Sequence, residues 1–159
     1  MATPTRKETT NATSSKETKP IIISPSYTTN TPSESFPNIS YGVVSWHTLF
    51  SQPQTPNSDL SAGIAVCPPK NGHLCAHRHE QAEIYYIIEG EGEVTIDGVK
   101  SQVTQGSSVF IPSHAEHGIA NTGSGDLRWF YVFPTAAFGD VVYRFTKDEP
   151  VGVQLGIWD

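Results

Sequence analysis

The sequence predicts an all-β protein whose strands form one antiparallel sandwich or barrel. Short apolar runs recur at spacings of about 8–12 residues and are separated by turn residues, which is the pattern of an all-β domain. From Asp59 onward no stretch has the periodicity of an amphipathic helix. The chain has no internal repeat, so we expect one barrel and not two.

Each expected strand is a short apolar or alternating run that ends at a turn signal. Asp97-Gly98 marks a tight hairpin, and large apolar residues alternate along Leu127–Phe133, as they do in a half-buried strand. The expected strands are Tyr41–Phe50, Leu60–Val66, Ile84–Ile88, Val94–Ile96, Val99–Val103, Val109–Ile111, His117–Ala120, Leu127–Phe133 and Val141–Phe145.

The segments outside this pattern differ in composition from the barrel. Residues 1–38 are rich in Thr, Ser, Pro, Lys and Glu, and such a segment buries too little apolar surface to offset its ordering entropy. We therefore expect a disordered extension, in which the cluster Ile21–Ile23 could add an edge strand. Residues 39–146 form the expected barrel domain, and residues 147–159 form a C-terminal tail.

Length and charge indicate a single domain and exclude several classes of partner. The 159 residues suggest roughly one domain, at about 150 residues each. The formal net charge of -6 and the lack of a basic block argue against nucleic acid and anionic membranes as partners. No apolar run is long enough to span a membrane, and the first residues lack the apolar core of a signal peptide. Cys67 and Cys75 are expected to be free thiols, and the protein is expected in the cytoplasm.

Polar residues of metal-binding type cluster in the stretch HRHEQAE, residues 77–83. In a strand, residues two apart face the same side, so His77 and His79 point together, as do Glu83 and Tyr85. If that side is the barrel interior, two imidazoles and a carboxylate converge beside a phenol. Such ligands suit Fe, Mn, Ni, Cu or Zn and leave open positions. His117 is the candidate for a fourth ligand.

The spacing of these residues resembles the two sequence motifs of the cupin family, over roughly residues 60–145. Two departures are a loop shorter by one residue before His77, and His114 where the family usually has glycine. The resemblance implies a jelly-roll barrel with a metal ion, iron first, held by the three histidines and the glutamate. The motifs are His77-x-His79-x3-Glu83-x6-Gly90 and Gly106-x5-Pro112-x4-His117-x3-Asn121.

Three further segments are similar to two groups of small cupins: AEIYYIIEGEGEV, AEHGIANTGSGDLRWFYVFP and DVVYRF. One group is the short lyases that cleave dimethylsulfoniopropionate, and the other is the oxidoreductases of fungal polyketide clusters, including salicylaldehyde-type pathways. The lyases would imply that Tyr85 takes a proton next to a carboxylate and that Tyr143 assists. The long N-terminal extension favours the second group by a small margin, so a metal-dependent oxidoreductase of secondary metabolism is expected, with a lyase or isomerase close behind and a non-catalytic binding protein third.

Each assignment has a simpler alternative. Tyr85 could be a wall of the pocket, and Tyr143 could be core packing, because a phenol with a pKa near 10 is a poor base unless a cation stabilises its phenolate. His73, Arg78 and His114 are expected at the surface. A small molecule is the expected partner, and a homodimer is the default assembly.

Overall fold

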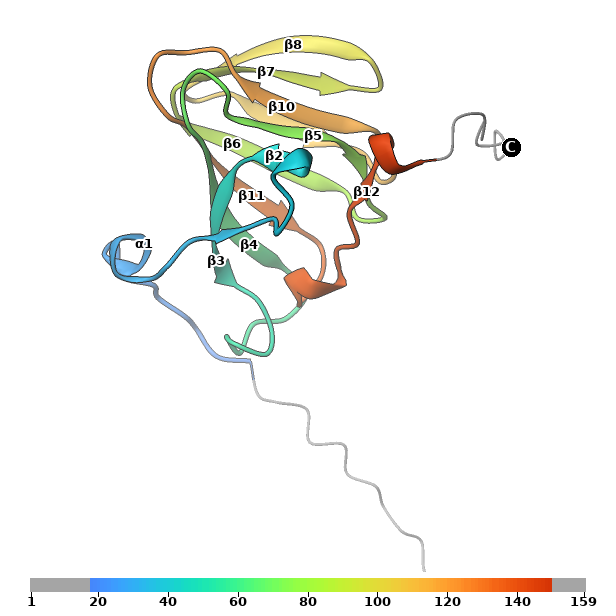
Figure 1. Ribbon diagram of the computed structural model, residues 1–159. Coiled ribbons are helices and arrows are strands. Elements are labelled where there is room, and N and C mark those ends of the chain that lie inside the picture. The colour runs from blue at the N-terminus through green and yellow to red at the C-terminus, as the bar shows by residue number, and fades with distance from the viewer. Residues whose placement is uncertain (1–17, 150–159) are drawn as a thin grey trace, which may run out of the picture.

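The computed structural model describes residues 18–149 (Figure 1). Its core is two sheets of six strands each, and every strand pair is antiparallel. The first sheet contains, in order, β1 (Glu34–Ser35), β3 (Ser45–Phe50), β4 (Ser61–Cys67), β11 (Leu127–Phe133), β6 (Glu83–Glu89) and β9 (Ser108–Ile111). The second contains β12 (Arg144–Phe145), β5 (His73–Arg78), β10 (His117–Asn121), β7 (Glu91–Ile96) and β8 (Val99–Thr104), with β2 (Gly42–Val43) also paired to β5.

The helical elements are short and lie at the ends of strands. Among the described residues they are one turn of α-helix, α1 (Tyr27–Asn30), and the 3-10 turns η1 (Ile39–Tyr41), η2 (Phe138–Asp140) and η3 (Thr146–Asp148). Within residues 18–149, no helix is long and apolar enough to cross a membrane. The all-β prediction is therefore confirmed.

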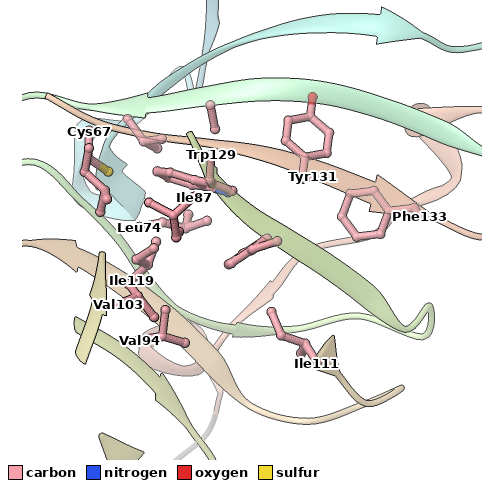
Figure 2. Packing of buried hydrophobic residues seen from close by; sticks show 14 of the residues in the cluster. Cys67, Leu74, Ile87, Val94, Val103, Ile111, Ile119, Trp129, Tyr131 and Phe133 are labelled. Carbon is pink, nitrogen blue, oxygen red and sulfur yellow. The ribbon is translucent and has the colours of Figure 1, made fainter. Parts of the chain in front are cut away.

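Alternation along the central strands builds the core between the sheets. On β11, Leu127, Trp129, Tyr131 and Phe133 are buried and the residues between them are less so. Figure 2 shows Trp129, Tyr131 and Phe133 of this strand in one cluster with labelled residues of β4, β5, β7 and β10. The same alternation on β6 turns Glu83 and Tyr85 inward and leaves Ile84 exposed. Because a strand presents its two faces in strict alternation, β6 has to place a carboxylate and a phenol inside the barrel.

Most of the expected strands are present, with three differences. The hairpin at Asp97-Gly98 is confirmed: both residues have positive φ, as a tight turn between β7 and β8 requires. β5 was not among the predicted strands, since its sequence HLCAHR is poor in β-branched residues. Instead, β5 is held by pairing to β10 on one side and to β2 and β12 on the other. The expected strand Val141–Phe145 is shortened to β12, and the expected strand Tyr41–Phe50 is divided into β2 and β3.

The prediction that disorder extends to residue 38 is wrong for residues 18–38. This segment contains α1 and β1, and β1 pairs with β3. The Glu34 carboxylate accepts hydrogen bonds from Trp46 Nε1 and the Thr48 amide, each at 3.0 Å. The expected edge strand is therefore Glu34–Ser35 rather than the cluster Ile21–Ile23. Residues 1–17 of the expected extension and residues 150–159 of the expected tail lie outside the described residues.

Candidate metal centre

Three histidines from neighbouring strands meet inside the barrel. His77 lies near the end of β5, His79 directly follows that strand, and His117 begins β10, where it is paired with His77. One ring nitrogen from each histidine lies within 4.8 Å of those of the other two. All three side chains are at most 1% exposed. The predicted convergence of these imidazoles is thus confirmed, and they are positioned to hold a metal ion.

The backbone fixes which nitrogen of each ring faces the centre. Every Nδ1 lies 2.8–2.9 Å from a main-chain carbonyl two residues away, on Cys75, Gln81 and Ala115 respectively. A carbonyl can only accept a hydrogen bond, so each Nδ1 carries the proton. Each Nε2 atom then has no proton, and its lone pair is directed toward the centre of the cluster. This is the arrangement by which proteins orient histidine ligands of metals.

Glu83 brings a carboxylate to the same point. Its Oε2 lies 3.2 Å from Nε2 of His79 and 3.2 Å from Nε2 of His117, and its side chain is 3% exposed. With both Nδ1 atoms protonated, neutral imidazoles offer this oxygen no donor, so lone pairs face lone pairs in a buried space. Only a cation or added protons resolve that arrangement.

The third histidine supports a cation over added protons. His77 Nε2 is buried and has no hydrogen-bond partner within the described part of the chain. Burial holds the pKa of His77 well below its usual value, and the nearby His117 lowers it further. A neutral imidazole with a free inward lone pair is the form that binds a metal. The donor set of imidazoles and a carboxylate fits a divalent transition metal.

The two tyrosines singled out by the sequence lie beside this cluster. Tyr85 is 1% exposed, and burial raises its pKa well above the usual value, with the Glu83 carboxylate and the Tyr143 phenol adding to the effect. Tyr143 stacks on the His77 ring at a centroid distance of 4.7 Å. Burial also raises the pKa of Tyr143, followed by the charge of Glu83. The structure therefore brings both phenols and the expected ligand cluster together.

A cavity lies against Glu83 and both tyrosines, and its empty space is about 330 Å³, including space open to solvent. Its walls are aromatic and aliphatic, and Glu83 is the one charged residue among the described residues that line it. Trp46, Trp129 and Tyr131 are among the aromatic residues that line it. Phe36, which falls in the extension expected to be disordered, and Phe138 also line the cavity. Neither was a candidate, because isolated aromatics outside the strand pattern carry no signal of their own.

The remaining polar residues stabilise the loops around the cluster. His114 is exposed, as expected, and has φ 63° at the position where the family motif usually has glycine. Positive φ favours glycine, so this departure from the motif retains the backbone conformation with a bulkier residue. Arg78, expected at the surface, is partly buried and pairs with Glu116 at 3.2 Å. Its Nη1 also donates to the His114 carbonyl. These contacts connect the loop before β10 to β5.

Comparisons with known proteins agree with this arrangement. Residues 64–133 match the model of the Cupin domain. The chain is 41% identical over 118 residues to a protein of Ruegeria pomeroyi named dimethylsulfoniopropionate lyase DddW, covering 74% of this chain and 76% of the relative. It is 37% identical over 65 residues to the oxalate-binding protein of Thermotoga maritima, covering 40% of this chain and 54% of that protein.

A solved structure extends the likeness to nearly the whole described chain. The polyketide cyclase RemF from Streptomyces resistomycificus superposes with a TM-score of 0.65 at 20% identity, covering 79% of this chain and 86% of that chain. At that identity the likeness concerns the fold. Fold and histidine cluster together define a small β-barrel protein with an interior site suited to a metal. The chain belongs to the cupin family.

Proposed function

We propose that this chain is a metal-dependent lyase that cleaves dimethylsulfoniopropionate, or a close β-substituted propionate, without net oxidation. The observation that carries the proposal is the position of Tyr85, a buried phenol beside Glu83 that shares the cavity with Tyr143. The 41% identity to a dimethylsulfoniopropionate lyase over three quarters of both chains supports it.

The proposed metal ligands are His77, His79, Glu83 and His117. Iron is the first candidate, with manganese, nickel, zinc and copper as alternatives, since imidazole and carboxylate ligands accept all of them. When bound, such an ion supplies positive charge that holds a substrate carboxylate and stabilises a neighbouring phenolate. The cluster needs that charge, because its lone pairs converge with no donor between them.

Tyr85 is the proposed base. Its phenolate takes a proton from the carbon next to the substrate carboxylate, the electron pair forms the carbon–carbon double bond, and the bond to sulfur breaks. The products are acrylate, dimethyl sulfide and a proton on Tyr85 that later passes to solvent. Tyr143 lies across the same cavity and is proposed to assist by holding the substrate or receiving the proton. General base catalysis of this kind contributes about 10²–10⁴-fold.

The cavity walls suit the other end of such a substrate. A sulfonium group is a cation with methyl substituents, and cations bind favourably over aromatic faces. Trp46, Trp129 and Phe138 line the cavity, and no Lys or Arg is found among the described residues that form it. A substrate with a cationic head is therefore accommodated by the aromatic rings. In contrast, a substrate with a second anionic group would meet no counter-ion here.

Oxidation remains the second candidate. Three imidazoles and a carboxylate also suit ferrous iron that reacts with oxygen, and the similarity to small fungal cupins favoured tailoring of a polyketide-type metabolite. That prediction receives no specific support from the comparisons, whereas the lyase does. A binding protein without catalysis is third, supported by the shorter match to an oxalate-binding protein. The homodimer and the cytoplasmic location stay predictions.

The test is turnover with and without oxygen. Purified full-length protein is analysed for metals, loaded with Fe²⁺, Mn²⁺ or Zn²⁺, and incubated with dimethylsulfoniopropionate, and dimethyl sulfide is measured by gas chromatography. Equal release of dimethyl sulfide under argon and air supports the lyase. Turnover of an aromatic or polyketide-like substrate that requires oxygen and iron, with no dimethyl sulfide, would replace it with the oxidoreductase. Tight binding of substrate without any turnover would instead support the third candidate, a binding protein without catalysis.

A further inference from the structure

Two hollows lie next to each other at one end of the barrel. The inner one is the cavity beside Glu83 and the tyrosines. The outer one encloses about 1150 Å³, including space open to solvent, and lies between the segment Ile23–Glu34 and the loop Ser51–Thr55. Phe138 lines both hollows. Phe138 is thus the one residue that the linings of the two hollows share among the described residues.

The N-terminal segment closes the other side of this boundary. Phe36 is partly buried while the residues around it, 32–35 and 37–40, are exposed, so its ring is the one that points inward there. It packs against Trp46 at 4.9 Å and Tyr143 at 5.6 Å between ring centroids. Glu34, two residues earlier, lines the outer hollow and holds the Trp46 indole through its hydrogen bond.

Besides the pairing of β1 with β3, four side-chain hydrogen bonds fasten this segment to β3. Besides the two hydrogen bonds of Glu34, His47 Nε2 donates to the Thr31 carbonyl at 2.9 Å, and the Tyr27 hydroxyl donates to the Thr48 carbonyl at 3.3 Å. The wall made by Phe36 and Trp46 is therefore held from both ends of the segment. Phe138 faces this wall, with its ring centroid 6.2 Å from that of Trp46.

Phe138 lies on a short turn and not on a strand. It begins the three-residue turn η2, and its amide donates a hydrogen bond of 2.8 Å to the Ser51 hydroxyl. Its ring lies 5.6 Å from Tyr131 and 5.9 Å from Phe133 between ring centroids, and it also meets Trp46 at 6.2 Å and Tyr143 at 6.4 Å. The next residue, Gly139, has open space around the position of a β-carbon. Because Phe138 lies on a turn, a shift of its ring would not require a strand to move.

We propose that the outer hollow is the entrance to the metal centre and that Phe138 is the gate that restricts entry by size. The proposal rests on the metal site proposed above and not on the reaction performed there. A small ligand passes when the ring moves aside, and a larger rigid ligand is held back. Phe138 is thereby a specificity-determining residue, and residues 27–36 form the fixed wall opposite it.

The experiment measures how fast chelators withdraw Co²⁺ from the cobalt-loaded full-length protein, followed by loss of the visible absorption of Co²⁺. Pyridine-2-carboxylate is the small chelator, and 1,10-phenanthroline is the large rigid one. Phe138→Ala is expected to raise the ratio of the large-chelator rate to the small-chelator rate by about fivefold or more. Gly139→Trp, which fills the entrance without removing any core packing, is expected to slow both rates by about fivefold or more.

Phe110→Ala is the matched control, since Phe110 is a 65% exposed phenylalanine on β9. Its rates are expected to equal those of the unchanged protein. If Gly139→Trp leaves both rates unchanged, the entrance lies elsewhere and the proposal is overturned, even if Phe138→Ala fails to fold. A chain that takes up no Co²⁺ overturns the metal centre and the gate with it. A chain that binds Co²⁺ but cleaves no dimethylsulfoniopropionate overturns the lyase alone.

Discussion

Asn121 connects the two sheets, and replacing it should destabilise the barrel by an amount that the structure allows to be worked out. Its side-chain amide donates to the carbonyls of Cys67 and Gly125, both at 2.8 Å, and its Oδ1 accepts from the Gly123 amide at 2.9 Å. Asn121 ends β10 of the second sheet, whereas Cys67 ends β4 of the first. The side chain is 9% exposed, so water replaces little of this network.

The expected cost of Asn121→Ala follows from these three hydrogen bonds. A typical intramolecular hydrogen bond contributes about 1 kcal/mol net, and a buried group left without a partner costs about 1–3 kcal/mol. The carbonyl of Cys67 is the buried partner, while the other two partners lie in a turn that water reaches. We therefore expect a loss of about 2–3 kcal/mol in the free energy of unfolding, or roughly 6–10 °C in Tm for a domain of this size.

Urea and thermal unfolding followed by far-UV circular dichroism, with all variants in the same metal state, measure this loss. Asn71→Ala is the control, because Asn71 is exposed and its side chain has no hydrogen bond among the described residues, so its effect should stay within about 0.5 kcal/mol. Asn121→Asp keeps the acceptor but turns a carboxylate toward two carbonyls, so it should cost at least as much as alanine. An aspartate variant as stable as the unchanged chain would refute the amide orientation and the reasoning with it.

Three other changes test the site and its surroundings. Tyr85→Phe should retain the metal but lower turnover by about 10²–10⁴-fold if this phenol is the base; unchanged turnover, measured as dimethyl sulfide release, would remove it from the mechanism. His77→Ala should abolish metal uptake in elemental analysis of the folded protein, whereas His73→Ala should not, and a full complement of metal in the first variant would contradict the ligand assignment. Burial raises the pKa of the Cys67 thiol to about 12, so alkylation of the native protein at pH 8 should label Cys75 alone, and peptide mass mapping that finds Cys67 labelled without unfolding would show that the core opens.

The sequence predicted the central strands because their signal lies in the residues themselves. Leu127–Phe133 alternates large apolar residues in the chain, and the same residues alternate between the core and the outer face of β11. β5 has little such signal, since His73–Arg78 contains one large aliphatic residue, and its strand conformation comes from the partners on either side. Pairing partners far away in the sequence are a property of the fold, so a local pattern cannot report them.

The same difference between local and long-range signals explains why the metal-ligand cluster could be predicted from the sequence and Phe36 could not. His77, His79 and Glu83 are close in sequence, and His117 follows at the spacing of a known motif, so the cluster could be predicted from type and spacing. Phe36 belongs to a segment whose composition favours disorder. Phe36 packs against the barrel because the nearby Glu34 carboxylate accepts hydrogen bonds from the Trp46 indole and the Thr48 amide on β3. These donors are brought together only after the barrel has formed.

A barrel that needed only stability would not place these polar groups in its interior. The three Nε2 atoms and the Glu83 carboxylate have lost water without gaining donors, and apolar residues of similar volume would avoid that cost. Local preferences are overridden where function requires it. The convergence of lone pairs is thus an argument for a bound cation that does not depend on any relative, and it explains why the spacing of these residues is more informative than the pattern of the strands that carry them.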